Sequence, residues 1–141
     1  MTKTIMLALL LVSMLILYGC TSQELVTPEL ILPEKCTFPV QIACVDFDVT
    51  KDSIAITVLN GAGRDMTIKS VTFSGDAVDG CVVERETPIA NREEATFEAT
   101  NCNIEPSRKG RGVFPMDVVY FWDEDPTAEH SLYGEMLASV R

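Results

Sequence analysis

The sequence predicts an all-β protein: an immunoglobulin-like β-sandwich of about seven strands that follows an N-terminal hydrophobic segment. Short runs in which apolar and polar residues alternate fill the chain after residue 35, and turn-forming residues separate them. These turns recur roughly every 8–12 positions, and the runs between them lack helical periodicity. Such spacing is typical of two antiparallel sheets packed face to face.

Each expected strand follows from its own apolar run. Val45, Phe47 and Val49 alternate with aspartates, so these three side chains are expected on a buried face. The apolar parity switches near Lys69 and Ser70, which predicts a β-bulge at that point. The expected strands span 45–49, 54–58, 68–73, 81–84, 95–99, 114–122 and 132–140, with loops at 51–52, 60–65, 74–80, 88–92, 106–112 and 123–126. In the clearest of them, Trp122 ends the strand beside a hairpin turn.

Residues 1–19 have the features of an export signal. Lys3 supplies a positive charge, and residues 5–17 form an apolar run in which Ser13 is the polar member. This run is shorter than the roughly 20 residues that cross a bilayer. A positive start and a short apolar run are typical of a signal peptide. We expect residues 1–19 to be a signal peptide or an anchor helix.

The apolar run ends in Leu17-Tyr18-Gly19-Cys20, which resembles a lipobox, the lipoprotein signal whose cysteine receives a lipid. Leu17, Gly19 and Cys20 match the pattern, whereas Tyr18 departs from it. The resemblance implies lipidation of Cys20 and anchoring to the outer face of a membrane of the cell envelope, extracellular or periplasmic. An ordinary cleaved signal and an uncleaved anchor are the alternatives.

The remainder divides into a tether and a domain. Residues 20–35 would be the lipidated cysteine and a proline-containing tether, in which residues 30–32 are a candidate for a short first strand. Residues 36–141 would form the β-sandwich.

Four cysteines remain beyond Cys20, and an even number in an exported chain suggests two disulfides. Three pairings are possible. We favour Cys36 with Cys44 and Cys81 with Cys102, because each pair encloses one contiguous segment. Free thiols and a four-cysteine zinc site are alternatives, although the spacings match no zinc ribbon.

The net charge and the sequence motifs argue against two classes of function, nucleic-acid binding and catalysis. With 21 acidic and 11 basic residues, the chain has a net charge of −10, which argues against nucleic-acid binding. The single histidine, His130, stands beside Ser131, but no Gly-x-Ser-x-Gly motif accompanies them. We therefore expect no enzyme, no catalytic residues and no cofactor.

Two charged clusters have alternative interpretations. Asp123-Glu124-Asp125 would form an acidic turn, which could bind calcium but is more typical of a solvated surface, so we expect no metal. Arg108-Lys109-Gly110-Arg111-Gly112 is either a solubilising loop or a contact for phosphate headgroups or an acidic neighbour, including the acidic turn of another copy.

Three segments resemble the extracellular sandwich of small archaeal pilin-like surface proteins: 32–39 with Cys36-Thr37-Phe38-Pro39, then Cys44-Val45-Asp46-Phe47, then 60–68. The resemblance implies a surface location and an outward-facing β-domain. The expected function is a non-enzymatic membrane-anchored lipoprotein that presents a binding or structural module. Its loops 60–66, 106–112 and 123–129, or an exposed edge strand, would meet a protein partner or another copy. The alternative is a pilin-like or pseudopilin subunit that retains the N-terminal helix.

Overall fold

The computed structural model describes residues 33–105 and 110–141, which form β-strands and their connections. Within these residues, no helix is long and apolar enough to cross a membrane. The hydrophobic segment 1–19, Cys20 and the candidate strand at 30–32 lie outside the described residues.

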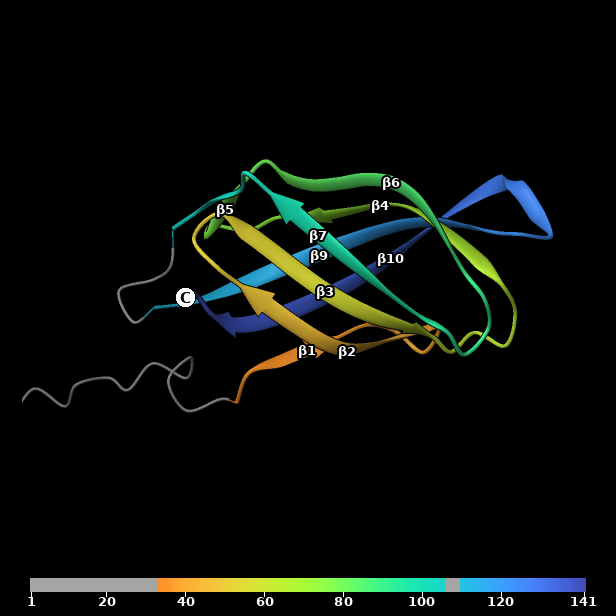
Figure 1. Ribbon diagram of the computed structural model, residues 1–141, viewed down its shortest axis with the longest axis horizontal. Helices are drawn as coiled ribbons and strands as arrows, with labels where there is room; N and C mark the ends of the chain where they lie inside the picture. Colours follow the sequence, from red (N-terminus) through yellow and green to blue (C-terminus); the bar gives the residue numbers. More distant parts are fainter. Residues whose placement is uncertain (1–32, 106–109) are drawn as a thin grey trace, which may run out of the picture. The chain divides into compact units, whose positions relative to one another are not determined.

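Two antiparallel sheets make up the domain. The larger has the order β1-β10-β9-β4-β6, formed by β1 (Lys35–Thr37), β10 (Asp125–Ser139), β9 (Arg111–Trp122), β4 (Met66–Phe73) and β6 (Cys81–Ile89). The smaller has the order β2-β3-β7, formed by β2 (Ile42–Val49), β3 (Ser53–Asn60) and β7 (Glu94–Thr100). A short pair joins β5 (Val78–Asp79) to β8 (Asn103–Ile104). Figure 1 shows the smaller sheet lying across one face of the larger. The chain therefore folds as an immunoglobulin-like β-sandwich, as the sequence predicted.

One hydrophobic core fills the space between the two sheets. Its fully buried members come from both sheets and include Ile54, Ile56, Val58, Phe97, Met66, Ile68, Val71, Phe114, Met116 and Val118. Each large apolar side chain removed from water contributes about 1.5–3 kcal/mol. The alternation that predicted β3, β7 and β9 is therefore the alternation between the core and the outer surface.

Register shifts occur at three places in the strand pairings, and two of them bear on the strands expected from the sequence. The pairing of β4 with both neighbours shifts between Ile68 and Ser70, which confirms the predicted bulge. A second shift, between Cys44 and Asp46 in the pairing of β2 with β3, was not predicted. It turns Val45 outward, leaving 51% of its surface exposed, so the expectation that Val45 lies on the buried face is wrong. The extra residue of a bulge moves the following side chains to the opposite face.

Several strand boundaries also differ from those predicted. β6 continues to Ile89, so Pro88 lies in a strand where a loop was expected. An edge strand tolerates proline, because the nitrogen that lacks a hydrogen can face away from the ladder. β10 already begins at Asp125, which pairs with Trp122 across a turn at Asp123 and Glu124, and uninterrupted pairing with β9 follows from Glu129 after a register shift. β1 adds a short edge strand that the alternation did not reveal.

Both disulfides expected from the sequence are present, and each joins the two sheets at one lateral edge. Cys36 in β1 is bonded to Cys44 in β2, with 5.7 Å between their Cα atoms. Cys81 at the start of β6 is bonded to Cys102 after β7, with a Cα separation of 5.0 Å. The sandwich is therefore closed covalently on both sides.

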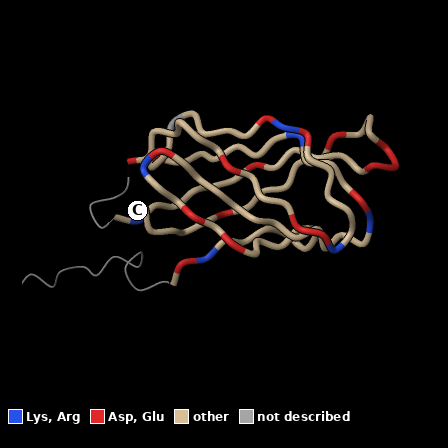
Figure 2. The backbone as a smooth tube through the Cα atoms, viewed as in Figure 1, with Lys and Arg blue, Asp and Glu red and all other residues tan. Residues whose placement is uncertain are grey.

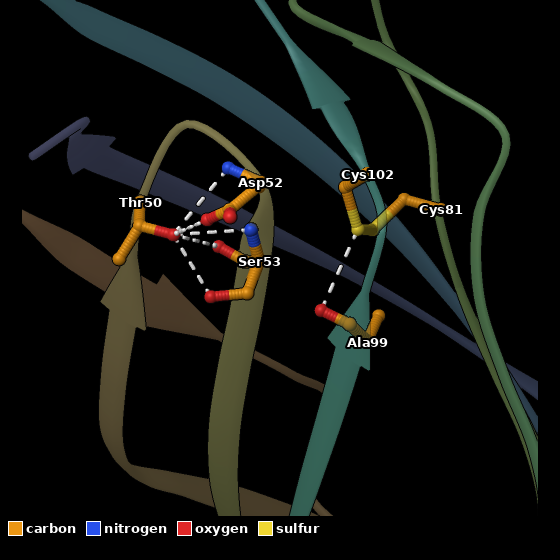
Figure 3. Close-up of a disulfide and its surroundings, with 6 residues drawn as sticks. All are labelled: Thr50, Asp52, Ser53, Cys81, Ala99 and Cys102. Atoms are coloured by element: carbon orange, nitrogen blue, oxygen red, sulfur yellow. Dashed lines mark hydrogen bonds between the residues drawn. A yellow bond between two sulfur atoms is a disulfide. The ribbon is translucent and has the colours of Figure 1, made fainter.

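The turn between β2 and β3 supports the second disulfide (Figure 3). The hydroxyl of Thr50 accepts hydrogen bonds from the backbone N–H groups of Asp52 and Ser53, at 3.4 and 3.0 Å. The Asp52 carbonyl in turn accepts a hydrogen bond of 2.9 Å from the N–H of Cys102. A side-chain-stabilised turn thus fixes the backbone of the disulfide partner.

We predict that replacing Cys81 and Cys102 together by alanine destabilises the domain more than the same change at Cys36 and Cys44. The chain-entropy contribution is about 3.3 kcal/mol for the longer loop and about 2.5 kcal/mol for the shorter one. Cys81 and Cys102 are also buried, so their removal leaves a cavity in the core. Urea unfolding of both double variants without reductant measures the difference. Equal midpoints, or a larger loss at the shorter loop, would contradict this ranking.

Candidate functional site

Four connections gather at one end of the sandwich, which we call the loop end (Figure 1): residues 38–41, 61–65, 90–93 and the β9–β10 turn. The first three each carry the chain from one sheet to the other. The described chain starts at the opposite end, where its C-terminus also lies. The loops 60–66 and 123–129 singled out from the sequence therefore share an end.

The described part of the third singled-out loop, residues 110–112, does not join them. Gly110 accepts a hydrogen bond of 2.8 Å from the N–H of Val140, which places its end of the 106–112 loop beside the C-terminus. Residues 106–109, with Arg108 and Lys109, lie outside the described residues.

Asn60, the last residue of β3, holds the loop end together. Its side chain is fully buried and donates to the carbonyls of Arg64 and Ile89, at 2.8 and 2.9 Å. Its side-chain oxygen accepts a hydrogen bond from the N–H of Ala62 at 3.0 Å. Its backbone N–H donates to the Glu93 carbonyl at 2.9 Å. One amide thus binds two of the sheet-to-sheet connections, and its burial is offset by these hydrogen bonds.

An aromatic cluster lies beneath the same loops. The guanidinium carbon of Arg64 lies 3.7 Å from the centroid of the Trp122 ring, a cation–π contact. The Tyr120 ring lies 5.0 Å from Trp122 and 5.3 Å from His130, measured between centroids. Burial raises the pKa of Tyr120, and the positive charge of Arg64 acts weakly in the opposite direction. The cluster therefore joins the β9–β10 hairpin to the 61–65 loop.

Above this cluster lies an open depression of about 470 Å³, lined by Gly63, Arg64, Asp65, Asn91, Asp123 and Glu124. Hydrogen bonds fix its carboxylates: Asp65 accepts from the N–H of Asn91, and Asp123 accepts from the hydroxyl of Thr67, both at 2.8 Å. With three carboxylates and one guanidinium that is already stacked on Trp122, the depression suits polar or cationic groups of a partner.

The candidate catalytic and metal-binding residues do not assemble into such sites. His130 shares a face of β10 with the aromatic cluster, and Ser131 is its strand neighbour, whose side chain points to the opposite face. The two therefore cannot form a nucleophile–base pair. Over residues 33–105 and 110–141, no group of three or more His, Cys, Asp or Glu side chains is placed to hold a metal ion. Asp123-Glu124-Asp125 instead forms part of an acidic hairpin tip (Figure 2).

Sequence reasoning missed the roles of Asn60 and Arg64 because the run 60–65 has the composition of a loop. A signal for Asn60 was nevertheless present. The alternation Ile54, Ile56, Val58 continues to position 60, which places that side chain in the core. A polar residue at such a position needs several hydrogen-bond partners.

Comparisons with known proteins add little to this description. No protein-family model and no curated protein matches the chain. Among solved structures, it is similar to the ASH / PapD-like domain of human CEP192 (PapD-like domain 7), with 13% sequence identity. The alignment covers 72% of this chain and 86% of that chain, with a TM-score of 0.36. A likeness of this degree carries no conclusion about family or function.

We predict that Asn60→Ala lowers the free energy of unfolding by about 1–3 kcal/mol, because it leaves the buried carbonyl of Ile89, the carbonyl of Arg64 and the N–H of Ala62 without their partner. Hydrogen exchange at residues 61–65 should accelerate as well. Urea unfolding and amide exchange test both effects, with Asn103→Ala, at an exposed position of the opposite end, as the control. Unchanged stability in Asn60→Ala would exclude this anchoring role.

We also predict a loss of stability at high pH that depends on Tyr120. Burial raises the pKa of Tyr120 in the folded state, so the unfolded chain releases this proton first. The contribution to stability is complete below the unfolded pKa of about 10 and is lost as pH rises above it. The difference in unfolding free energy between wild type and Tyr120→Phe, measured from pH 8 to 11.5, should shrink at the alkaline end. A difference that stays constant across this range would contradict the prediction.

Proposed function

We propose that this protein is a non-enzymatic surface lipoprotein, anchored to the outer face of a membrane through Cys20, whose sandwich serves as a binding or structural module. The observation that carries this proposal is the pair of disulfides that join the sheets at both edges. Disulfides form and persist in oxidising compartments, which are extracellular or periplasmic. A structural module in such a compartment fits the interpretation of residues 1–19 as an export signal.

The position of the loop end supports binding there. A tether that enters the described domain at Pro33 joins it at the end that also carries the C-terminus (Figure 1). Anchoring through residue 20 would therefore leave the loop end available to a partner. Because Asn60 and the Arg64–Trp122 contact fix its loops before binding, association would need little ordering of the backbone.

The entry of the chain is itself held to the domain. Glu34 accepts a hydrogen bond of 2.9 Å from the N–H of Ser139, and the hydrogen bonds to Ser139 lower the pKa of this carboxyl group. Lys35–Thr37 then pairs with β10, and Cys36 is bonded to Cys44. A force on the tether would therefore be resisted by both the pairing of β1 with β10 and the Cys36–Cys44 disulfide, as suits a domain displayed on a surface.

We predict that Cys20→Ser moves the protein from the membrane fraction to the soluble fraction, because two lipid chains are needed for stable anchoring and the variant can accept none. The intact mass of the wild-type protein extracted from membranes should correspond to a chain that lacks residues 1–19 and carries a lipid. Thr21→Ser is the matched control and should remain on the membrane.

The same experiment separates the alternatives. If the protein is a pilin-like subunit that retains its N-terminal helix, the Cys20→Ser variant would stay in the membrane fraction. Its intact mass would then include residues 5–17. An ordinary cleaved signal would leave even the wild type soluble and without a lipid. Either result would exclude the lipoprotein proposal.

A further inference from the structure

The outer face of the larger sheet is rich in apolar residues, as is typical of a face that packs against another layer. In β9, the core side chains alternate with outward-facing residues that are themselves mostly apolar: Val113, Pro115, Val119 and Phe121. A strand that is apolar on both faces is typical of one buried on both faces. Here one face packs on the core, whereas the other carries no layer formed by the described strands.

Asp117 lies in the middle of this outward row. Strand pairing places it in one rung with Tyr133 of β10, Thr72 of β4 and Val82 of β6. Tyr133, next to Asp117, is 68% exposed, and Val82, beyond Thr72 on the other side, is 43% exposed. Of the buried side-chain oxygens and nitrogens among the described residues, Asp117 Oδ1 is the one without a hydrogen-bond partner. A buried carboxylate oxygen without a partner is costly, and a donor from outside would remove that cost.

Two lysines near this row already have carboxylate partners. Lys69 forms an ion pair with Glu129, and Lys35 lies 3.9 Å from Glu135. An apolar centre with a polar rim is the usual anatomy of a protein–protein interface. These lysines are therefore not available to Asp117, whose buried Oδ1 remains without a donor.

We propose that the outer face of β10, β9, β4 and β6 is a docking surface for another protein, which presents an arginine or lysine to Asp117 within an apolar surround. Charge argues against two other occupants. A symmetric contact with a second copy would oppose Asp117 to its own counterpart. Residues 1–34 of the chain itself contain three glutamates and one basic residue, Lys3, which belongs to the segment 1–19 that the proposed function removes. This docking surface is distinct from the loop end, and it rests on the proposed removal of residues 1–19 but not on lipidation of Cys20.

The test places a photoreactive p-benzoylphenylalanine at position 133 of the full chain, in the cells that naturally produce it. We expect one cross-linked protein whose contact peptide contains an arginine or lysine. Asp117→Asn should lower the yield at least tenfold, because it keeps the shape of the side chain and removes its charge. Glu84→Gln, a change of another carboxylate on the same face, should leave the yield unchanged.

A second variant and a stability measurement guard against misfolding. Val119→Lys adds a positive charge beside Asp117 and should abolish the adduct, and urea midpoints establish that each variant is folded. A cross-link to a second copy, an adduct that persists in Asp117→Asn, a contact peptide without a basic residue, or no adduct at all would overturn the proposal.

Discussion

The two covalent links between the sheets are the constraint on which the rest of this structure depends. Each lies at a lateral edge, and each encloses a connection that carries the chain from one sheet to the other: 38–41 within the Cys36–Cys44 loop, and 90–93 within the Cys81–Cys102 loop. Edge strands are the positions where a sandwich most readily separates or pairs with other chains. The links hold β1 to β2 and β6 to the segment after β7, so the apolar residues between the sheets remain enclosed.

Closure at the edges leaves two different surfaces for contact with other molecules. At the loop end, buried side-chain hydrogen bonds of Asn60 and the stacking of Arg64 on Trp122 order three connections without regular secondary structure. On the outer face of the larger sheet, the backbone is already rigid, and the side chains of β9 determine what fits. The first surface is polar and acidic, whereas the second has an apolar row around Asp117. Their chemistry therefore suits different partners, and the domain has room for both.

The two faces of β9 have different roles: one stabilises the core, and the other belongs to the proposed docking surface. Its inward residues from Phe114 to Trp122 fill the core, and this alternation was visible in the sequence. Its outward residues are also apolar, a pattern typical of strands with both faces covered. Within the folded domain, Asp117 is the exception that remains without a partner for Oδ1. β9 is thus the strand whose alternation is clearest in the sequence, and its outward apolar residues are covered by none of the described strands.

Local patterns in the sequence determined the strands of the core, the bulge at Lys69 and the pairing of the four domain cysteines. Each depends on residues close together in the chain: alternation reports which side chains face the core, and short loops favour pairing of neighbouring cysteines. Tertiary structure alone decided that Val45 faces outward and that Asn60 ties two connections together. It also decided that the loops 60–66 and 123–129 share an end, whereas Gly110 lies beside the C-terminus. These features depend on which strands become neighbours, and that choice is made by contacts between segments far apart in the sequence.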